Sequence, residues 1–108
     1  MENTNKAIIY VRGDDKAQQE MICYFYAYRH NLDVLFVTDD IEQVVDCEEC
    51  NMVLVRDASR ISRKSTEYYQ IVKALKKRGI EVVTTMTPKN VEFIVNLLEE
   101  DLKGRKMK

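Results

Sequence analysis

Residues 59–64 read Ser-Arg-Ile-Ser-Arg-Lys, and this short stretch is the most informative segment of the chain. It comes after the apolar run Met52–Val55, which has the length and β-branching of a buried strand, and it opens a helical pattern that ends at Gly79. Arg60 and Arg63 stand three residues apart where a strand crosses to a helix, so they face one way and suit phosphate oxygens. The stretch therefore predicts an α/β unit with an anion-binding crossing.

The same alternation extends along the whole chain. Short apolar runs predict strands at 7–12, 32–37, 52–55 and 80–85. Helices are predicted behind Asp14 and Asp15, which are N-cap candidates, over 41–45, from the arginine stretch to Gly79, and over 89–103 behind Thr87-Pro88. This order predicts an α/β fold: a small doubly wound, mainly parallel four-stranded sheet with helices on both faces, resolvase- or flavodoxin-like.

Helical spacing also predicts which side of the first helix meets the sheet. Apolar residues recur there at positions that one helix face would share, and we expect them to pack in the core. They are Ala17, Met21, Tyr24, Phe25 and Tyr28.

Composition limits the classes of function. The 108 residues predict a single domain, with 45% apolar and 32% charged side chains, as in globular proteins. A net charge of −1 provides no global attraction for nucleic acid or an anionic membrane, so any basic function must be local. No apolar run has the length of a membrane span, and the N-terminus lacks a signal-peptide pattern, so we expect a cytoplasmic protein without membrane contact.

The three cysteines do not predict a metal site. Cys47 and Cys50 have the spacing of half a zinc site, but the other half is missing, because Cys23 and His30 are the only further soft ligands. We therefore expect reduced thiols, no metal and no cofactor.

Polar residues come after every predicted strand. Arg12 and Asp14 come after the first strand, and Asp57, Arg60 and Arg63 come after the third. Ligands of doubly wound folds bind outside the carboxyl ends of the strands. Arginines and carboxylates are thus predicted to meet at one edge of the sheet, although loops are also polar simply because they contact water.

At these residues the chain resembles a known family. The segment Tyr10-Val11-Arg12-Gly13-Asp14-Asp15, with Gln18 three residues on, is similar to the opening Tyr-x-Arg-Val-Ser-Thr…Gln of the serine recombinases (resolvases and invertases). Residues 59–64, with the helix and strand that run to Thr85, resemble the family's Asp-Arg-Leu-x-Arg-Ser motif and its downstream helix and strand. The resemblance covers residues 7–85, with a gap in the middle, and implies the family's N-terminal catalytic domain.

The resemblance implies a DNA-cutting domain that lacks some of the family's catalytic residues and one of its loops. The family cuts DNA with a serine that attacks a phosphodiester, and arginines stabilise the transition state. Tyr10, Arg12, Gln18, Arg60 and Arg63 keep the family pattern, Asp14 stands where the nucleophilic serine should be, and Ser59 replaces the motif's aspartate. A longer mobile loop with a further arginine has no counterpart between Asp39 and Met52, so the domain is degenerate and truncated relative to the family.

These departures predict a domain that has lost strand cleavage. Arg12, Arg60 and Arg63 are the expected contacts to a DNA phosphate, and Asp14 is expected to neutralise them. The domain would then be an interaction or regulatory module in site-specific recombination rather than an enzyme.

Two alternatives remain open. A response-regulator receiver would hold Mg²⁺ with Asp14 and Asp15 and accept phosphate on Asp57. A flavodoxin-like interaction module would carry no site chemistry.

The C-terminal part predicts a partner. We expect one domain over 1–108, with a C-terminal helix over 86–103, a basic tail over 104–108 and no DNA-binding domain. Phe93 and Leu97 flank the apolar stripe of that helix and widen it beyond what one contact needs. They predict a homodimer, or a heterodimer with a recombinase, through this helix.

Overall fold

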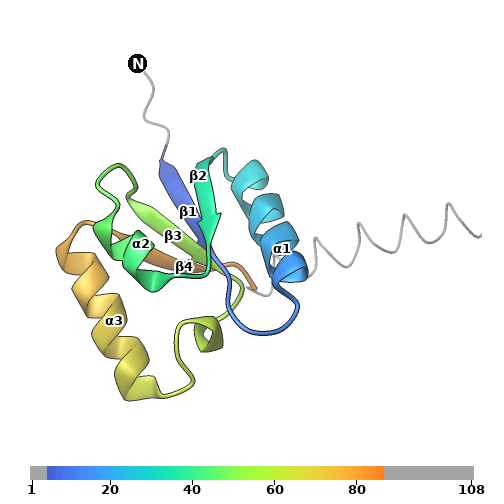
Figure 1. Cartoon of the computed structure of the whole chain (residues 1–108). Helices are drawn as coiled ribbons and strands as arrows, with labels where there is room; N and C mark the ends of the chain where they lie inside the picture. The colour runs from blue at the N-terminus through green and yellow to red at the C-terminus, as the bar shows by residue number, and fades with distance from the viewer. Residues whose placement is uncertain (1–4, 87–108) are drawn as a thin grey trace, which may run out of the picture.

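A four-stranded sheet forms the centre of the protein (Figure 1), for which a computed structural model describes residues 5–86. Its strands are β1 (Lys6–Tyr10), β2 (Asp33–Thr38), β3 (Met52–Val55) and β4 (Glu81–Thr84). They lie in the order β2-β1-β3-β4, and all three neighbouring pairs are parallel. The predicted doubly wound α/β sheet is confirmed.

Helices cover both faces of this sheet, as Figure 1 shows. Helix α1 (Lys16–Arg29) packs on one face, and α2 (Ile41–Asp46) and α3 (Ser65–Lys77) pack on the other. Successive strand residues point to opposite faces, so Ile8 joins the core under α2 and α3 while Ile9 joins the core under α1. Both side chains are fully buried.

The prediction of which face of α1 is buried is wrong. Met21, Tyr24 and Tyr28 are exposed, with 86% of Tyr28 accessible, and the helix instead buries another side. The buried residues are Gln19, Ile22, Cys23 and Ala27. The amide of Gln19 binds backbone groups of the loop before the helix, and the small Cys23 and Ala27 allow close approach to the sheet. These two contacts determine which side of α1 faces the sheet, and they leave the side with Tyr24 and Tyr28 exposed.

The arginine stretch does not begin the long helix. It first forms one turn of 3₁₀ helix, η1 (Ala58–Arg60), then a loop, and α3 begins only at Ser65. The predicted end of the helix is confirmed: Gly79 has φ of 81°, which glycine adopts without steric cost, and Ile80 N–H donates to the Leu75 carbonyl at 2.9 Å.

Asp15 takes the N-cap position of α1 as predicted, but its side chain makes no capping hydrogen bond. Its φ of 60° places it in the left-handed region. Its backbone carbonyl accepts the first hydrogen bond of the helix, from the Gln19 N–H at 3.0 Å.

Three further predictions concern membranes, metals and the C-terminal helix. Among residues 5–86, no helix is both long and apolar enough to cross a membrane. The same residues contain no group of three or more histidine, cysteine or acidic side chains that could hold a metal ion. All three cysteines are free, and burial raises the pKa of Cys50 to about 11. All of the predicted helix 86–103 except Met86, including Phe93 and Leu97, lies outside the described residues.

Candidate functional site

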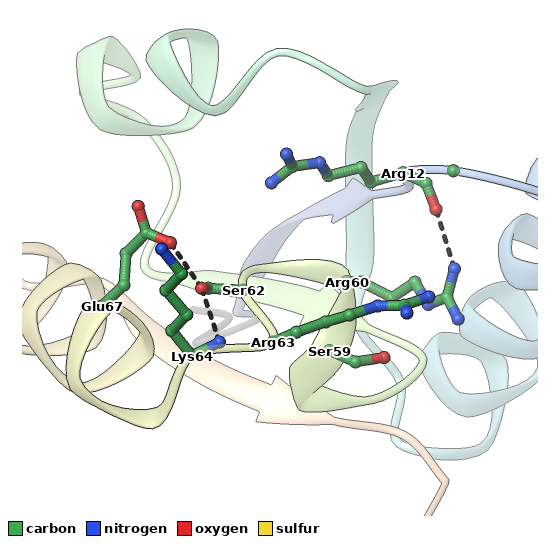
Figure 2. A pocket seen from close by; sticks show the side chains of 8 residues that line it. Arg12, Ser59, Arg60, Ser62, Arg63, Lys64 and Glu67 are labelled. Atoms are coloured by element: carbon green, nitrogen blue, oxygen red, sulfur yellow. Dashed lines mark hydrogen bonds between the residues drawn. The ribbon is translucent and has the colours of Figure 1, made fainter.

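A hollow of about 330 Å³ opens where β1 and β3 end, and Figure 2 shows it from close by. The loop after β1 provides one wall, and the segment between β3 and α3 provides the other. Its lining residues are Arg12, Gly13, Ser59, Arg60, Ser62, Arg63, Lys64 and Glu67. The structure thus brings three predicted arginines to one cavity, at the edge of the sheet where the sequence places them.

Arg60 is the most enclosed of the three arginines. It ends η1, and only 15% of its side chain is exposed. Its Nη1 donates to the Arg12 carbonyl at 3.0 Å, and its Nε lies 3.5 Å from Asp57 Oδ1 without forming a hydrogen bond. A guanidinium held by a backbone carbonyl and a carboxylate keeps one orientation and presents a fixed charge.

Arg12 makes the reciprocal hydrogen bond between the two walls. Its Nη1 donates to the Ile61 carbonyl at 3.2 Å, so each of Arg12 and Arg60 binds the backbone of the other's segment. In Figure 2 the Arg12 guanidinium points away from those of Arg60 and Arg63, which extend in one direction. The three arginines therefore share the hollow without converging on a single point.

Arg63 is exposed, as Arg12 is, but no hydrogen bond between the two walls is recorded for it in the described part of the chain. No ion pair recorded among residues 5–86 includes it or its neighbour Lys64. Both residues line the hollow together with one carboxylate, Glu67, whose Oε1 accepts from the Ser62 hydroxyl, so the lining has an excess of positive charge that suits an anion.

Asp57, which the sequence places after the third strand and in the receiver alternative, is the carboxylate that pairs with Arg56 and Arg60. Its Oδ2 lies 2.8 Å from Arg56 Nε, and its Oδ1 accepts from the Ser59 N–H at 3.1 Å and from the Ser59 hydroxyl. Burial raises the pKa of Asp57, but the Ser59 and Arg56 hydrogen bonds and the charges of Arg60 and Arg56 outweigh it, so the pKa lies below its usual value.

Arg56 was missed by sequence reasoning. It sits between the predicted strand and the arginine stretch, and the only available signal was its place next to Asp57. Its Nη1 donates to Gln18 Oε1 at 2.7 Å. Gln18, the glutamine that matches the serine recombinase pattern, is exposed and binds Arg56.

Gln19 was also missed, and it organises the first wall. Its Oε1 accepts from the Arg12 N–H at 3.0 Å, and its Nε2 donates to the carbonyls of Arg12 and Asp14 at 2.9 and 2.8 Å. The side chain is fully buried. Gly13 lies in this wall with φ of 80°, and a Cβ there would meet Arg60 Nη1 at 3.3 Å. A glycine therefore permits both the turn and the close guanidinium.

Asp14 and Tyr10 stand apart from the hollow. Asp14 is exposed, does not line the cavity, and takes part in none of the ion pairs recorded among residues 5–86. The expectation that Asp14 neutralises the arginines is therefore wrong, because the carboxylate that pairs with Arg60 is Asp57. Tyr10 is 3% exposed and packs in the core under α2 and α3.

The two serines of the hollow are both bonded to carboxylates. The Ser59 hydroxyl binds Asp57, and the Ser62 hydroxyl donates to Glu67 Oε1 at 2.6 Å while accepting from the Lys64 N–H at 3.1 Å. Ser62 thereby connects the loop to the first turn of α3, as capping residues do.

Three solved structures share this fold. The N-terminal catalytic domain of TP901-1 integrase matches with a TM-score of 0.69 and 17% identity, over 96% of this chain and 99% of that one. The C-terminal catalytic domain of ISC1926 TnpA, an IS607-like serine recombinase, matches with a TM-score of 0.65 and 16% identity, over 93% and 84%. A resolvase family site-specific recombinase from Streptococcus pneumoniae matches with a TM-score of 0.68 and 9% identity, over 96% and 92%.

No protein-family model and no curated protein matches the sequence. At these low identities the likeness concerns the fold. The chain is a resolvase-like α/β domain, with the fold of the serine recombinase catalytic domains.

Proposed function

We propose that this domain acts in site-specific DNA recombination by holding a DNA phosphate without cutting the strand. The observation that carries the proposal is the single hollow lined by Arg12, Arg60 and Arg63 at the carboxyl edge of a resolvase-like sheet. A phosphate there would meet the guanidinium groups of Arg60 and Arg63, which extend in one direction (Figure 2), and that of Arg60 is already held by the Arg12 carbonyl, which favours charge-assisted hydrogen bonds. The domain then serves as an interaction or regulatory module.

The residues near the arginines favour a domain that does not cleave DNA. Asp14 occupies the position where the resemblance puts the nucleophilic serine, and its carboxylate repels a phosphate. Ser59 and Ser62 are the hydroxyls of the hollow, and both are held in bonds that shape the loop.

The purified chain is expected to form no covalent adduct with DNA. Radiolabelled duplex DNA incubated with the protein should run as free DNA on a denaturing gel, because no free nucleophile faces the arginines. A protein-linked band would contradict the proposal. Asp14→Ala, Ser59→Ala and Ser62→Ala would then locate the nucleophile, since only one of them should remove the band.

Phosphate binding is tested separately by fluorescence anisotropy with labelled duplex DNA. Arg63→Ala should weaken binding and reduce the dependence on salt by about one phosphate contact. Lys6→Ala is the control, because Lys6 starts β1 at the opposite edge of the sheet. Equal affinities for wild type and Arg63→Ala would refute phosphate binding in the hollow.

We further propose that the C-terminal segment supplies the partner contact, either in a homodimer or in a heterodimer with a recombinase. Phe93→Glu combined with Leu97→Glu should give a folded monomer in sedimentation velocity, because charges on an apolar face oppose its burial. Asn90→Glu combined with Asn96→Glu adds the same charge and is the control. A wild type that sediments as a monomer, alone and mixed with a recombinase, would rule this out.

The receiver alternative finds less support. Its phosphate acceptor, Asp57, is bonded to Arg56 and to Ser59 and lies beside Arg60. With Asp14 and Asp15 it makes no recognisable metal cluster in the described part of the chain.

A further inference from the structure

Charge is segregated along the chain in a way that the net value of −1 hides. Residues 56–78 hold eight of the 17 lysines and arginines but only two of the 18 acidic residues. The remainder of the chain is correspondingly acidic. Except for Arg56, which pairs with Asp57, the basic residues of this segment belong to the arginine hollow or to helix α3 with its C-terminal end, so within residues 5–86 positive charge is concentrated there.

The exposed side of α3 carries part of this charge. Thr66, Gln70, Lys73 and Lys77 recur at spacings of three to four residues, which puts them on one side of the helix. Leu75, which is fully buried, points the opposite way into the core. We call this side the basic face of α3 and include Tyr69, which borders it.

No acidic side chain of α3 neutralises the basic face. The only carboxylate of this helix is Glu67, and its Oε1 is bound by the Ser62 hydroxyl at 2.6 Å. The ion pairs recorded among residues 5–86 include neither Lys73 nor Lys77. In a chain with nearly equal numbers of basic and acidic residues, an acid-free face of this length is a local excess of positive charge that suits a polyanion.

The basic face of α3 also contains a shallow hollow, beside Tyr69 and Lys73. Lys73 Nζ lies 5.9 Å from the centroid of the Tyr69 ring, and 64% of Tyr69 is exposed. Together with Ser65, Thr66 and Gln70 they line a shallow hollow of about 410 Å³. Lys64 lines the arginine hollow and Ser65, the next residue, lines this one, so the two hollows have consecutive lining residues.

We propose that the basic face of α3 is a second DNA surface, along which the phosphate backbone of double-stranded DNA continues away from the arginine hollow. The proposal rests on the proposed function for the choice of DNA as the polyanion. The helix has 13 residues and is therefore about 20 Å long, enough to pass several phosphates of one strand. Lysines and hydroxyls spaced along it suit backbone contacts, which are independent of sequence.

The test uses Lys73→Gln combined with Lys77→Gln in the full chain. Glutamine keeps the helix propensity and a similar side-chain length while removing both charges. Anisotropy is measured with a labelled duplex of about 20 base pairs over a range of salt concentrations. Two lost contacts should weaken binding about tenfold or more at low salt and reduce the magnitude of the log–log salt slope by about two.

Two matched variants isolate the charge. Lys73→Arg combined with Lys77→Arg should bind like the wild type, since the charge is kept. Lys6→Gln removes a charge at the start of β1, at the opposite edge of the sheet from the arginine hollow and outside the basic face, and it should leave the slope unchanged. Circular dichroism confirms that each variant is folded.

The outcomes separate this inference from the proposed function. Wild-type affinity in Lys73→Gln/Lys77→Gln, with weakened binding in Arg63→Ala, overturns the basic face and leaves the arginine hollow standing. Weakened binding in the α3 variant with none in Arg63→Ala supports the face and overturns the hollow. If polyglutamate displaces the duplex as well as unlabelled duplex does at equal charge, DNA is the wrong occupant and the inference fails.

Discussion

Replacing Gln19 with leucine is expected to lower the free energy of unfolding by about 2–4 kcal/mol. Leucine fills a similar volume, so the loss comes from hydrogen bonding rather than from a cavity. The Arg12 N–H and the Asp14 carbonyl would lose their side-chain partner, which is itself fully buried. The Arg12 carbonyl would keep only Arg60 Nη1.

Urea unfolding monitored by circular dichroism measures this difference. Gln18→Leu is the control, because the neighbouring side chain is exposed and bonds only Arg56, so its change should stay within about 0.5 kcal/mol. If Gln19→Leu were as stable as Gln18→Leu, the amide of Gln19 would not hold the loop. Gln19→Glu should also destabilise the protein, since a carboxylate cannot donate to the two carbonyls.

Replacing Asp57 with asparagine is expected to cost about 1–3 kcal/mol of unfolding free energy at neutral pH. The change keeps the shape of the side chain but removes the charge that lies beside Arg56 and the enclosed Arg60. Two guanidinium groups would then lie close together without a counter-charge, and the wall of the hollow would loosen.

The pH dependence identifies the cause. The pKa of Asp57 in the folded protein lies below its usual value of 3.8, so its stabilising effect is complete above that value. It is lost as the pH falls through the lower, folded-state pKa. The stability difference between wild type and Asp57→Asn should therefore shrink below about pH 4. A difference that stays constant from neutral to acidic pH would show that charge is not its source. Asp39→Asn, which breaks the exposed pair with Lys16, is a control for surface effects.

Local patterns in the sequence were enough to predict most of the architecture. Met52–Val55 is a strand with the predicted bounds, and Gly79 ends α3 as predicted. Such features depend on neighbouring residues alone: β-branched runs suit a sheet, and a glycine suits a positive φ. The strand-helix alternation then leaves few ways to connect the elements, and the observed parallel order is one of them.

The site was predicted in part, because only some of its contacts are local. Arg12, Arg60 and Ser59 meet at one edge since the carboxyl ends of parallel strands lie together. The choice of counter-ion was wrong: the family pattern favoured Asp14, whereas the side chain that reaches Arg60 is Asp57, three residues before it and on the same turn. Spacing along the chain does not reveal which carboxylate a folded loop turns inward.

The composition and periodicity of the chain by themselves determined that it forms a parallel α/β sheet with arginines at its carboxyl edge. Only the tertiary structure decided which side of α1 faces that sheet, because Met21, Tyr24 and Tyr28 form a helical stripe as regular as the buried one. The decision came from Gln19, whose amide matches three backbone groups of a loop that exists only once the chain is folded. Burying those groups unpaired costs more than exposing tyrosines, whose hydroxyls remain in water.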